Sequence, residues 1–152
     1  VVERLHADPK VRSNLEIELD RGIGACWLRQ SPIAELVENA LLHFDGRRYR
    51  LLAWCIMPNH VHALIELAVG ERLGDIVGSW KKFTARKANE LIGRSGAFWQ
   101  EDYWDRFIRH DAHLAAAISY VEQNPVKAGL ITEADLWPWS SARMRREAEA
   151  QS

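Results

Sequence analysis

Apolar and polar positions alternate along this chain with two different periods. Near residues 32–43 and 71–92 the apolar residues recur every three or four positions, which predicts two amphipathic helices. Near residues 48–57 and 60–67 they form short apolar runs of the kind that strands show. Because Pro58-Asn59 separates these two runs, they are predicted to form a β-hairpin.

Two histidines interrupt the second strand, in the stretch MPNHVHALIEL at residues 57–67. Side chains alternate between the faces of a strand, so one face is an apolar packing surface made of Val61, Ala63, Ile65 and Leu67. His60 and His62 lie on the other face, roughly 7 Å apart along the strand, where both imidazoles can reach one cation. Two surface histidines on a half-exposed strand are the alternative explanation. Neutral imidazole suits Mn, Fe, Ni or Zn better than Mg, although phosphate-binding sites often use Mg.

A third helix is predicted from Asp111 to about Gln123, where Pro125 ends the helical pattern. Tyr120 and Asn124 are four residues apart, so their side chains are neighbours at roughly 5–6 Å. A single helical tyrosine is usually structural. A tyrosine one turn before a polar side chain, in a chain that also holds two alternating histidines, is a candidate for chemistry.

The length and composition are those of an ordinary single domain, which we expect to span residues 1–152. No run of eighteen apolar residues is present, so no membrane partner is expected. The formal net charge of -1 gives no overall case for nucleic acid. The one concentrated basic patch lies on and just after the second helix, at Lys81, Lys82, Arg86, Lys87 and Arg94. A solvated helix face explains this patch unless a nucleic-acid site lies nearby.

The two cysteines have no metal-ligand spacing, so free thiols and a cytoplasmic location are expected. Val1 stands in place of methionine and no signal-peptide pattern follows it, so we expect the sequence to begin inside a longer protein. Residues 97–109 are rich in aromatic rings and end in a predicted strand at 106–109. Most of these rings are expected in the core, and some could stack on unpaired bases.

Five stretches together resemble one family: MPNHVHALIEL, SWKKFTARKAN, FWQEDYWDRFIR, YVEQNPVKAGL and WPWSSA. In this order they are similar to the REP-associated tyrosine transposases, which are single-tyrosine HUH transposases of bacteria. The resemblance covers residues 23–142. It implies that Tyr120 is the nucleophile, and that His60 and His62 hold a divalent cation, Mg or Mn, with Asn124 completing the site.

The resemblance also implies the fold, an α+β domain with a ferredoxin-like antiparallel sheet. Helices cover one face of the sheet, and the tyrosine helix approaches from the other. Family members begin with a strand in the centre of the sheet, but residues 1–22 show no clear counterpart. Leu15, Ile17 and Leu19 alternate with acids there, and a short helix fits this segment equally well. We therefore expect the first strand to be missing, leaving a gap beside the histidine strand, and residues 144–152 to be a frayed tail.

The implied function is metal-dependent cleavage and joining of single-stranded DNA through a 5′-phosphotyrosine, acting on hairpins from palindromic repeats. The basic patch would hold part of the hairpin, and either a monomer or a homodimer fits. A hairpin-binding module of the same fold without catalysis is one alternative. A metal-dependent nucleotide hydrolase is another, but that chemistry usually needs a third alternating histidine, and position 64 is Leu.

Overall fold

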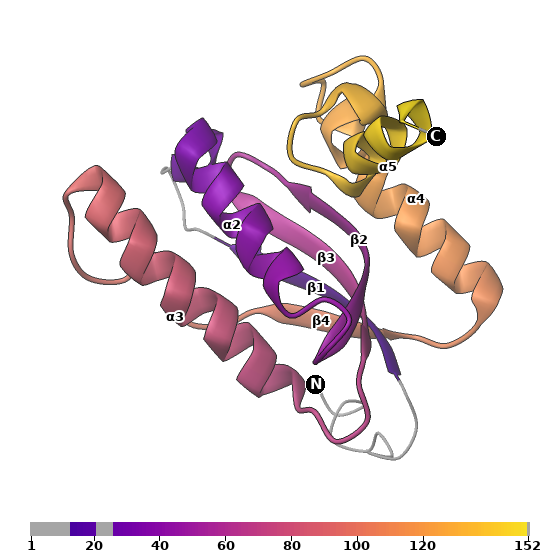
Figure 1. Ribbon diagram of the computed structural model, residues 1–152, viewed down its shortest axis with the longest axis horizontal. Coiled ribbons are helices and arrows are strands. Elements are labelled where there is room, and N and C mark those ends of the chain that lie inside the picture. The colour runs from indigo at the N-terminus through magenta and orange to yellow at the C-terminus, as the bar shows by residue number, and fades with distance from the viewer. Residues whose placement is uncertain (1–12, 21–25, 152) are drawn as a thin grey trace.

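The computed structural model describes residues 13–20 and 26–151, which form a four-stranded antiparallel sheet with helices on both faces (Figure 1). The strands stand in the order β2-β3-β1-β4. Their bounds are β1 Ser13–Asp20, β2 Tyr49–Ile56, β3 His60–Leu67 and β4 Trp104–Ile108. The longer helices are α2 Ser31–His43, α3 Leu73–Ile92, α4 Asp111–Lys127 and α5 Ser141–Ala150, with short 3-10 turns at Trp27–Arg29 and Ala134–Leu136. The predicted α+β fold is confirmed.

Helices α2 and α3 cover one face of the sheet and enclose the larger core (Figure 1). Val61, Ala63 and Ile65 of β3 are buried in this core together with apolar residues of both helices, such as Val37 and Val77. The packing face predicted for the histidine strand is therefore confirmed.

Helix α4 lies on the opposite face, over a smaller core. Leu64 of β3 and Cys55 of β2 are fully buried there against Ala117 and Val121 of α4. This packing fixes the helix that carries Tyr120 on the face of the sheet that carries the histidines.

Strand β1 lies in the centre of the sheet beside β3, where we expected a strand to be missing. Its residues pair with β3 from Ser13↔Leu67 to Asp20↔His60, and with β4 from Asn14↔Ile108 to Glu18↔Trp104. Leu15, Ile17 and Leu19 enter the larger core while the intervening acids face α4. The prediction of a gap beside β3 was wrong, because the alternation in this segment has the period of a strand that is buried on one face.

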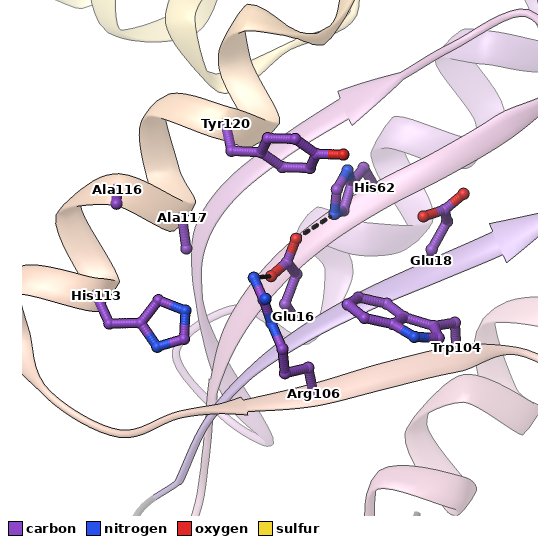
Figure 2. A pocket seen from close by; sticks show the side chains of 9 residues that line it. All are labelled: Glu16, Glu18, His62, Trp104, Arg106, His113, Ala116, Ala117 and Tyr120. Atoms are coloured by element: carbon purple, nitrogen blue, oxygen red, sulfur yellow. Dashed lines mark hydrogen bonds and ion pairs between the residues drawn. The ribbon is translucent and has the colours of Figure 1, made fainter.

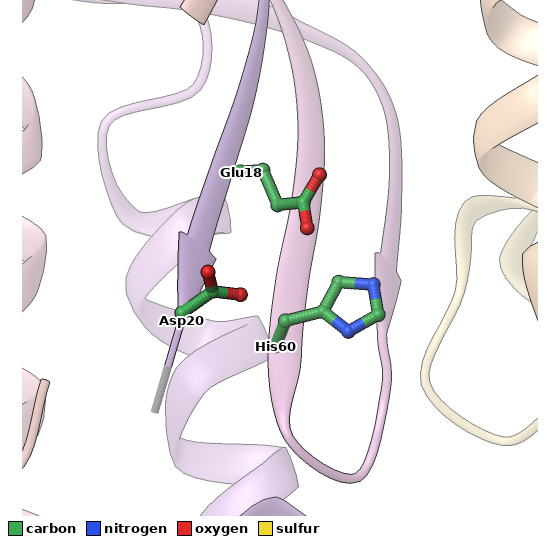
Figure 3. A group of neighbouring side chains, drawn as sticks. All are labelled: Glu18, Asp20 and His60. Atoms are coloured by element: carbon green, nitrogen blue, oxygen red, sulfur yellow. The ribbon is translucent and has the colours of Figure 1, made fainter. Parts of the chain in front are cut away.

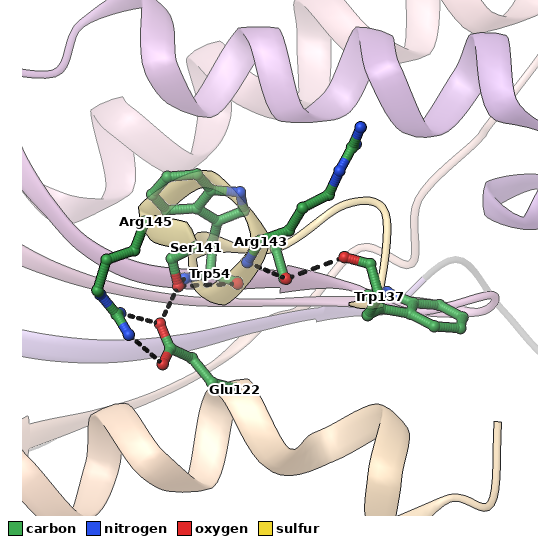
Figure 4. Close-up of polar contacts among 7 residues, drawn as sticks. Trp54, Glu122, Trp137, Ser141, Arg143 and Arg145 are labelled. Atoms are coloured by element: carbon green, nitrogen blue, oxygen red, sulfur yellow. Dashed lines mark hydrogen bonds and ion pairs between the residues drawn. The ribbon is translucent and has the colours of Figure 1, made fainter. Parts of the chain in front are cut away.

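Strand β2 has apolar residues on both faces, a pattern typical of a central strand, but it lies at the edge of the sheet. The C-terminal segment covers that edge: the Ile56 amide donates to the Trp139 carbonyl, and the Trp54 amide donates to Ser141 Oγ (Figure 4). A bulge between Leu51 and Ala53 also shifts the register with β3, so Leu51 shares a face with Trp54.

The C-terminal tail is helical through Ala150, and the expectation of fraying from residue 144 was wrong. Arg145 of α5 donates two hydrogen bonds to the buried carboxylate of Glu122 in α4, at 3.2 and 2.5 Å, and Ser141 donates a third at 2.6 Å (Figure 4). These contacts tie α5, α4 and the edge of β2 together.

Cys26 and Cys55 are both free thiols, as expected. Burial raises the pKa of Cys55 to about 12. Within the described ranges, no helix combines the length and apolar character that a membrane span requires.

Candidate tyrosine and metal site

Helix α4 presents Tyr120 beside the sheet. The helix was predicted to end near Gln123, but it continues through Pro125 to Lys127. A proline in the last turn removes one backbone donor, and Ala128 closes the helix by donating to the Asn124 carbonyl. Asn124 therefore stays helical, one turn after Tyr120 and on the same side of α4.

Tyr120 and Asn124 both reach His62 of β3. The rings of Tyr120 and His62 meet edge to face with their centroids 5.5 Å apart. The Asn124 side-chain amide lies 3.0 Å from His62 Nδ1. The tyrosine is half exposed, whereas His62 is buried, so the phenol faces open space above a fixed imidazole.

The other nitrogen of His62 is bound by Glu16, a buried acid of β1. Glu16 Oε1 lies 2.7 Å from His62 Nε2, and Arg106 of β4 donates to Glu16 Oε2 at 2.5 Å (Figure 2). Burial acts to raise the pKa of Glu16, but the hydrogen bonds from His62 and Arg106 outweigh it and leave the pKa lowered. Glu16 is thus a carboxylate that holds the His62 ring in one orientation, as partners of metal-binding histidines commonly do.

His60 has different neighbours. One ligand atom from each of His60, Glu18 and Asp20 lies within 4.8 Å of the others (Figure 3). Burial lowers the pKa of His60, which favours the neutral imidazole that a metal requires. One imidazole nitrogen and two carboxylate oxygens are a donor set that suits Mn or Mg, so these residues fit a divalent cation.

The three ligands implied by the sequence are thus brought onto one face of the sheet, in two neighbouring groups. His62 and Asn124 are in direct contact, while His60 lies with the carboxylates of β1. Both nitrogens of His62 have close partners, so His62 must exchange one of these contacts to ligate a cation.

A cleft of about 560 Å³ opens beside these groups, between α4 and the strands β1, β3 and β4 (Figure 2). Tyr120 and His113 of α4 line one wall, and Trp104 and Arg106 of β4 line the other. His62 lies on the sheet between the two walls. The cleft can therefore admit a ligand that reaches the Tyr120 phenol.

The basic patch lies on the other side of the sheet, because α3 packs on the face opposite α4 (Figure 1). Lys81 donates from Nζ to the carbonyls of Gln100 and Glu101, at 2.7 and 2.9 Å, so its ammonium holds the loop before β4. Lys82 and Arg86 are exposed, and Lys87 pairs with Glu90 at 3.7 Å.

Reasoning from the sequence missed the acids of β1 and the pair Trp104 and Arg106 of β4. The signal for the acids was their alternation with Leu15, Ile17 and Leu19. It became informative only with the cross-strand register, which sets Asp20 opposite His60 and Glu18 opposite His62.

Both the sequence and the fold of this chain match known proteins. The profile of the family described as Transposase IS200 like matches residues 31–124, and the chain belongs to this family. A Haemophilus influenzae protein assigned as a REP-associated tyrosine transposase is 31% identical over 111 residues, which are 66% of this chain and 63% of that protein. The REP-associated tyrosine transposase of Escherichia coli K12 is 26% identical over 95 residues, 62% of this chain and 55% of that protein. The chain thus spans less than two thirds of the length of these curated relatives.

Two solved structures share the fold. A REP-associated tyrosine transposase bound to a REP hairpin superposes with a TM-score of 0.71 at 20% identity, covering 90% of this chain and 81% of that one. A crystal structure assigned as a transposase of Deinococcus radiodurans R1 gives a TM-score of 0.54 at 18% identity, covering 75% and 91%. The resemblance drawn from the sequence motifs is confirmed.

Proposed function

We propose that this chain is a metal-dependent single-stranded DNA endonuclease and strand transferase that acts on hairpin DNA in transposition. One observation carries the proposal: the half-exposed Tyr120 meets His62, which Asn124 also contacts, at the wall of an open cleft. Family membership supports DNA as the substrate class, and the hairpin-bound structural relative supports a hairpin as its form.

Tyr120 is the best placed of the chain's three tyrosines. Tyr49 is buried and its phenol donates to the Leu41 carbonyl, while Tyr103 packs against the larger core. The Tyr120 phenol loses its proton to solvent and attacks the scissile phosphorus. A bond forms between the phenol oxygen and phosphorus, the bond to the 3′ oxygen breaks, and that oxygen takes up a proton as the leaving hydroxyl. The reverse reaction rejoins strands without ATP.

His60, His62 and Asn124 would hold a divalent cation, Mg or Mn, and Glu18 and Asp20 can add oxygen ligands. When bound, such an ion would neutralise charge that develops on the phosphate oxygens. Glu16 fixes the orientation of His62, and Arg106 keeps Glu16 ionised. On the other side of the sheet, the basic patch would bind backbone phosphates of the hairpin through Lys82, Arg86, Lys87 and Arg94, and Lys81 would add its positive charge.

The alternative of a binding module without catalysis depended on a missing first strand, and β1 now fills that place. A nucleotide hydrolase with three alternating histidines is also disfavoured, since Leu64 at the third position is fully buried.

Tyr120→Phe tests the proposal, because it removes one oxygen and keeps the ring. The wild type, incubated with a labelled hairpin oligonucleotide and Mn, should leave a denaturation-resistant adduct that peptide mapping assigns to Tyr120. The variant should fold and bind metal but form no adduct and cleave nothing. Cleavage by the variant, or an adduct on Tyr103, would refute the assignment.

A further inference from the structure

The aromatic segment at 98–107 contains five rings, and the structure separates them by side of the sheet. Phe98 and Trp99 are buried in the larger core, and Tyr103 and Phe107 pack against that core. Trp104 alone among them lies on the opposite side, where it lines the cleft with 47% of its surface exposed.

Arg106 lies two residues along the same strand and faces the same way. Its guanidinium carbon is 5.6 Å from the centroid of the Trp104 ring. The hydrogen bond to Glu16 anchors the guanidinium and uses one of its five N–H donors. Because the side chain remains 45% exposed, the other donors are available to an incoming group.

We propose that Trp104 and Arg106 form a subsite for one unpaired nucleotide of the DNA substrate, with its base stacked on the indole and its phosphate on the guanidinium. This subsite rests on the proposed function and defines how the strand enters the site. Trp104 lies across the cleft from Tyr120, with His62 between them (Figure 2). A nucleotide held on Trp104 therefore places the adjoining backbone on the path to the phenol.

The chemistry of the walls favours an unpaired nucleotide over other ligands. An exposed indole stacks on any base, whereas the bases of a duplex have their faces covered by their neighbours. A planar guanidinium next to the ring matches the phosphate that accompanies every base. Glu16 does not repel that phosphate, because its charge is balanced by Arg106 and its hydrogen bond to His62.

Binding measurements in the Tyr120→Phe background test the subsite without cleavage. The probe is a hairpin oligonucleotide with single-stranded flanks on both sides, either intact or with one abasic site at each flank position in turn. Trp104→Ala should weaken binding of the intact probe by about 5- to 150-fold, the usual range for one stacked base. Trp104→Phe should recover most of the affinity.

At one flank position, an abasic site should abolish the difference in affinity between the protein with Trp104 and the Trp104→Ala variant, because the ring then has no base to stack on. Leu136→Ala is the control: Leu136 is also 41% exposed, but it lies in the turn Ala134–Leu136 and does not line the cleft. Equal effects of the two alanine variants, no effect of Trp104→Ala, or a loss that no abasic position removes would each overturn the subsite.

The Tyr120 adduct assay distinguishes this failure from failure of the proposed function. If the wild type forms the adduct but Trp104→Ala does not weaken binding of the intact probe, the subsite alone is rejected. Coupling between Trp104 and one flank position, with no adduct in the wild type, would support the subsite and reject the chemistry.

Discussion

Replacing Arg145 with methionine is expected to destabilise the fold by about 2 kcal/mol, and so to loosen the helix that carries Tyr120. Arg145 is 52% exposed, but the carboxylate that it binds, Glu122, is only 9% exposed. An exposed ion pair contributes about 0–1 kcal/mol, and breaking a buried one costs about 3–5 kcal/mol. A pair with one buried member lies between these limits. For a chain of this length, the corresponding fall in Tm is about 4–8 °C.

The neighbouring residue supplies a matched control. Arg146 is on the same helix and is 54% exposed, but its partner Asp135 is 42% exposed and 3.7 Å away. Arg146→Met should therefore change the free energy of unfolding by less than about 1 kcal/mol. Urea denaturation of both variants at neutral pH measures the difference. Equal destabilisation would refute the reasoning, because it would show that burial of the carboxylate adds nothing.

A double-mutant cycle separates the ion pair from the packing of the arginine stem. Glu122→Gln removes the charge that Arg145→Met leaves without its partner. The double variant should therefore be more stable than the sum of the single effects predicts, by about 1 kcal/mol or more. Additive effects would show that Arg145 acts through packing alone.

Acid should weaken the fold through Glu16. Its pKa is lowered below the ordinary value of 4.5, so its stabilising contribution is complete above that pH and is lost as the pH falls through the folded-state pKa. The difference in unfolding free energy between wild type and Glu16→Gln should be present at pH 7 and shrink as the pH falls below 4.5. Calorimetric titration with Mn should show affinity falling at a pH below 6.5, the ordinary histidine value, because protons compete for imidazole and burial lowers the pKa of His60. His62→Ala should bind Mn much more weakly. For the basic patch, Lys82→Ala with Arg86→Ala should lower the salt dependence of DNA binding by about one unit of slope per lost phosphate contact. Lys81→Ala should instead lower Tm, because its ammonium bonds backbone carbonyls.

The sequence predicted those features that depend on the period of one segment. The faces of β3 follow from strict alternation, so the packing of Val61 and Ile65 and the opposite position of the histidines were predictable. The spacing of Tyr120 and Asn124 required only a helix, and the structure brings both to His62.

Features that depend on pairing between distant segments were not predictable. The segment Leu15–Leu19 fits a strand or a short helix, and what decides is its pairing with β3 on one side and β4 on the other. Contacts between distant segments also decide the structure of the C-terminal tail and the position of β2 in the sheet. Arg145 stabilises the tail through an acid on another helix, and the apolar faces of β2 indicate burial but not a place within the sheet.

The cleft is lined partly by residues that were not among the predicted site residues. Each predicted catalytic residue comes from β3 or α4, but the groups that hold and surround them come from β1 and β4. Glu16 reaches His62, and Arg106 reaches Glu16, only because β1 lies between β3 and β4. The same strand order turns Trp104, one of several rings in an aromatic segment, into the wall that faces Tyr120. The residues that orient the histidine and line the cleft are therefore selected by strand order, which no single stretch of the sequence encodes.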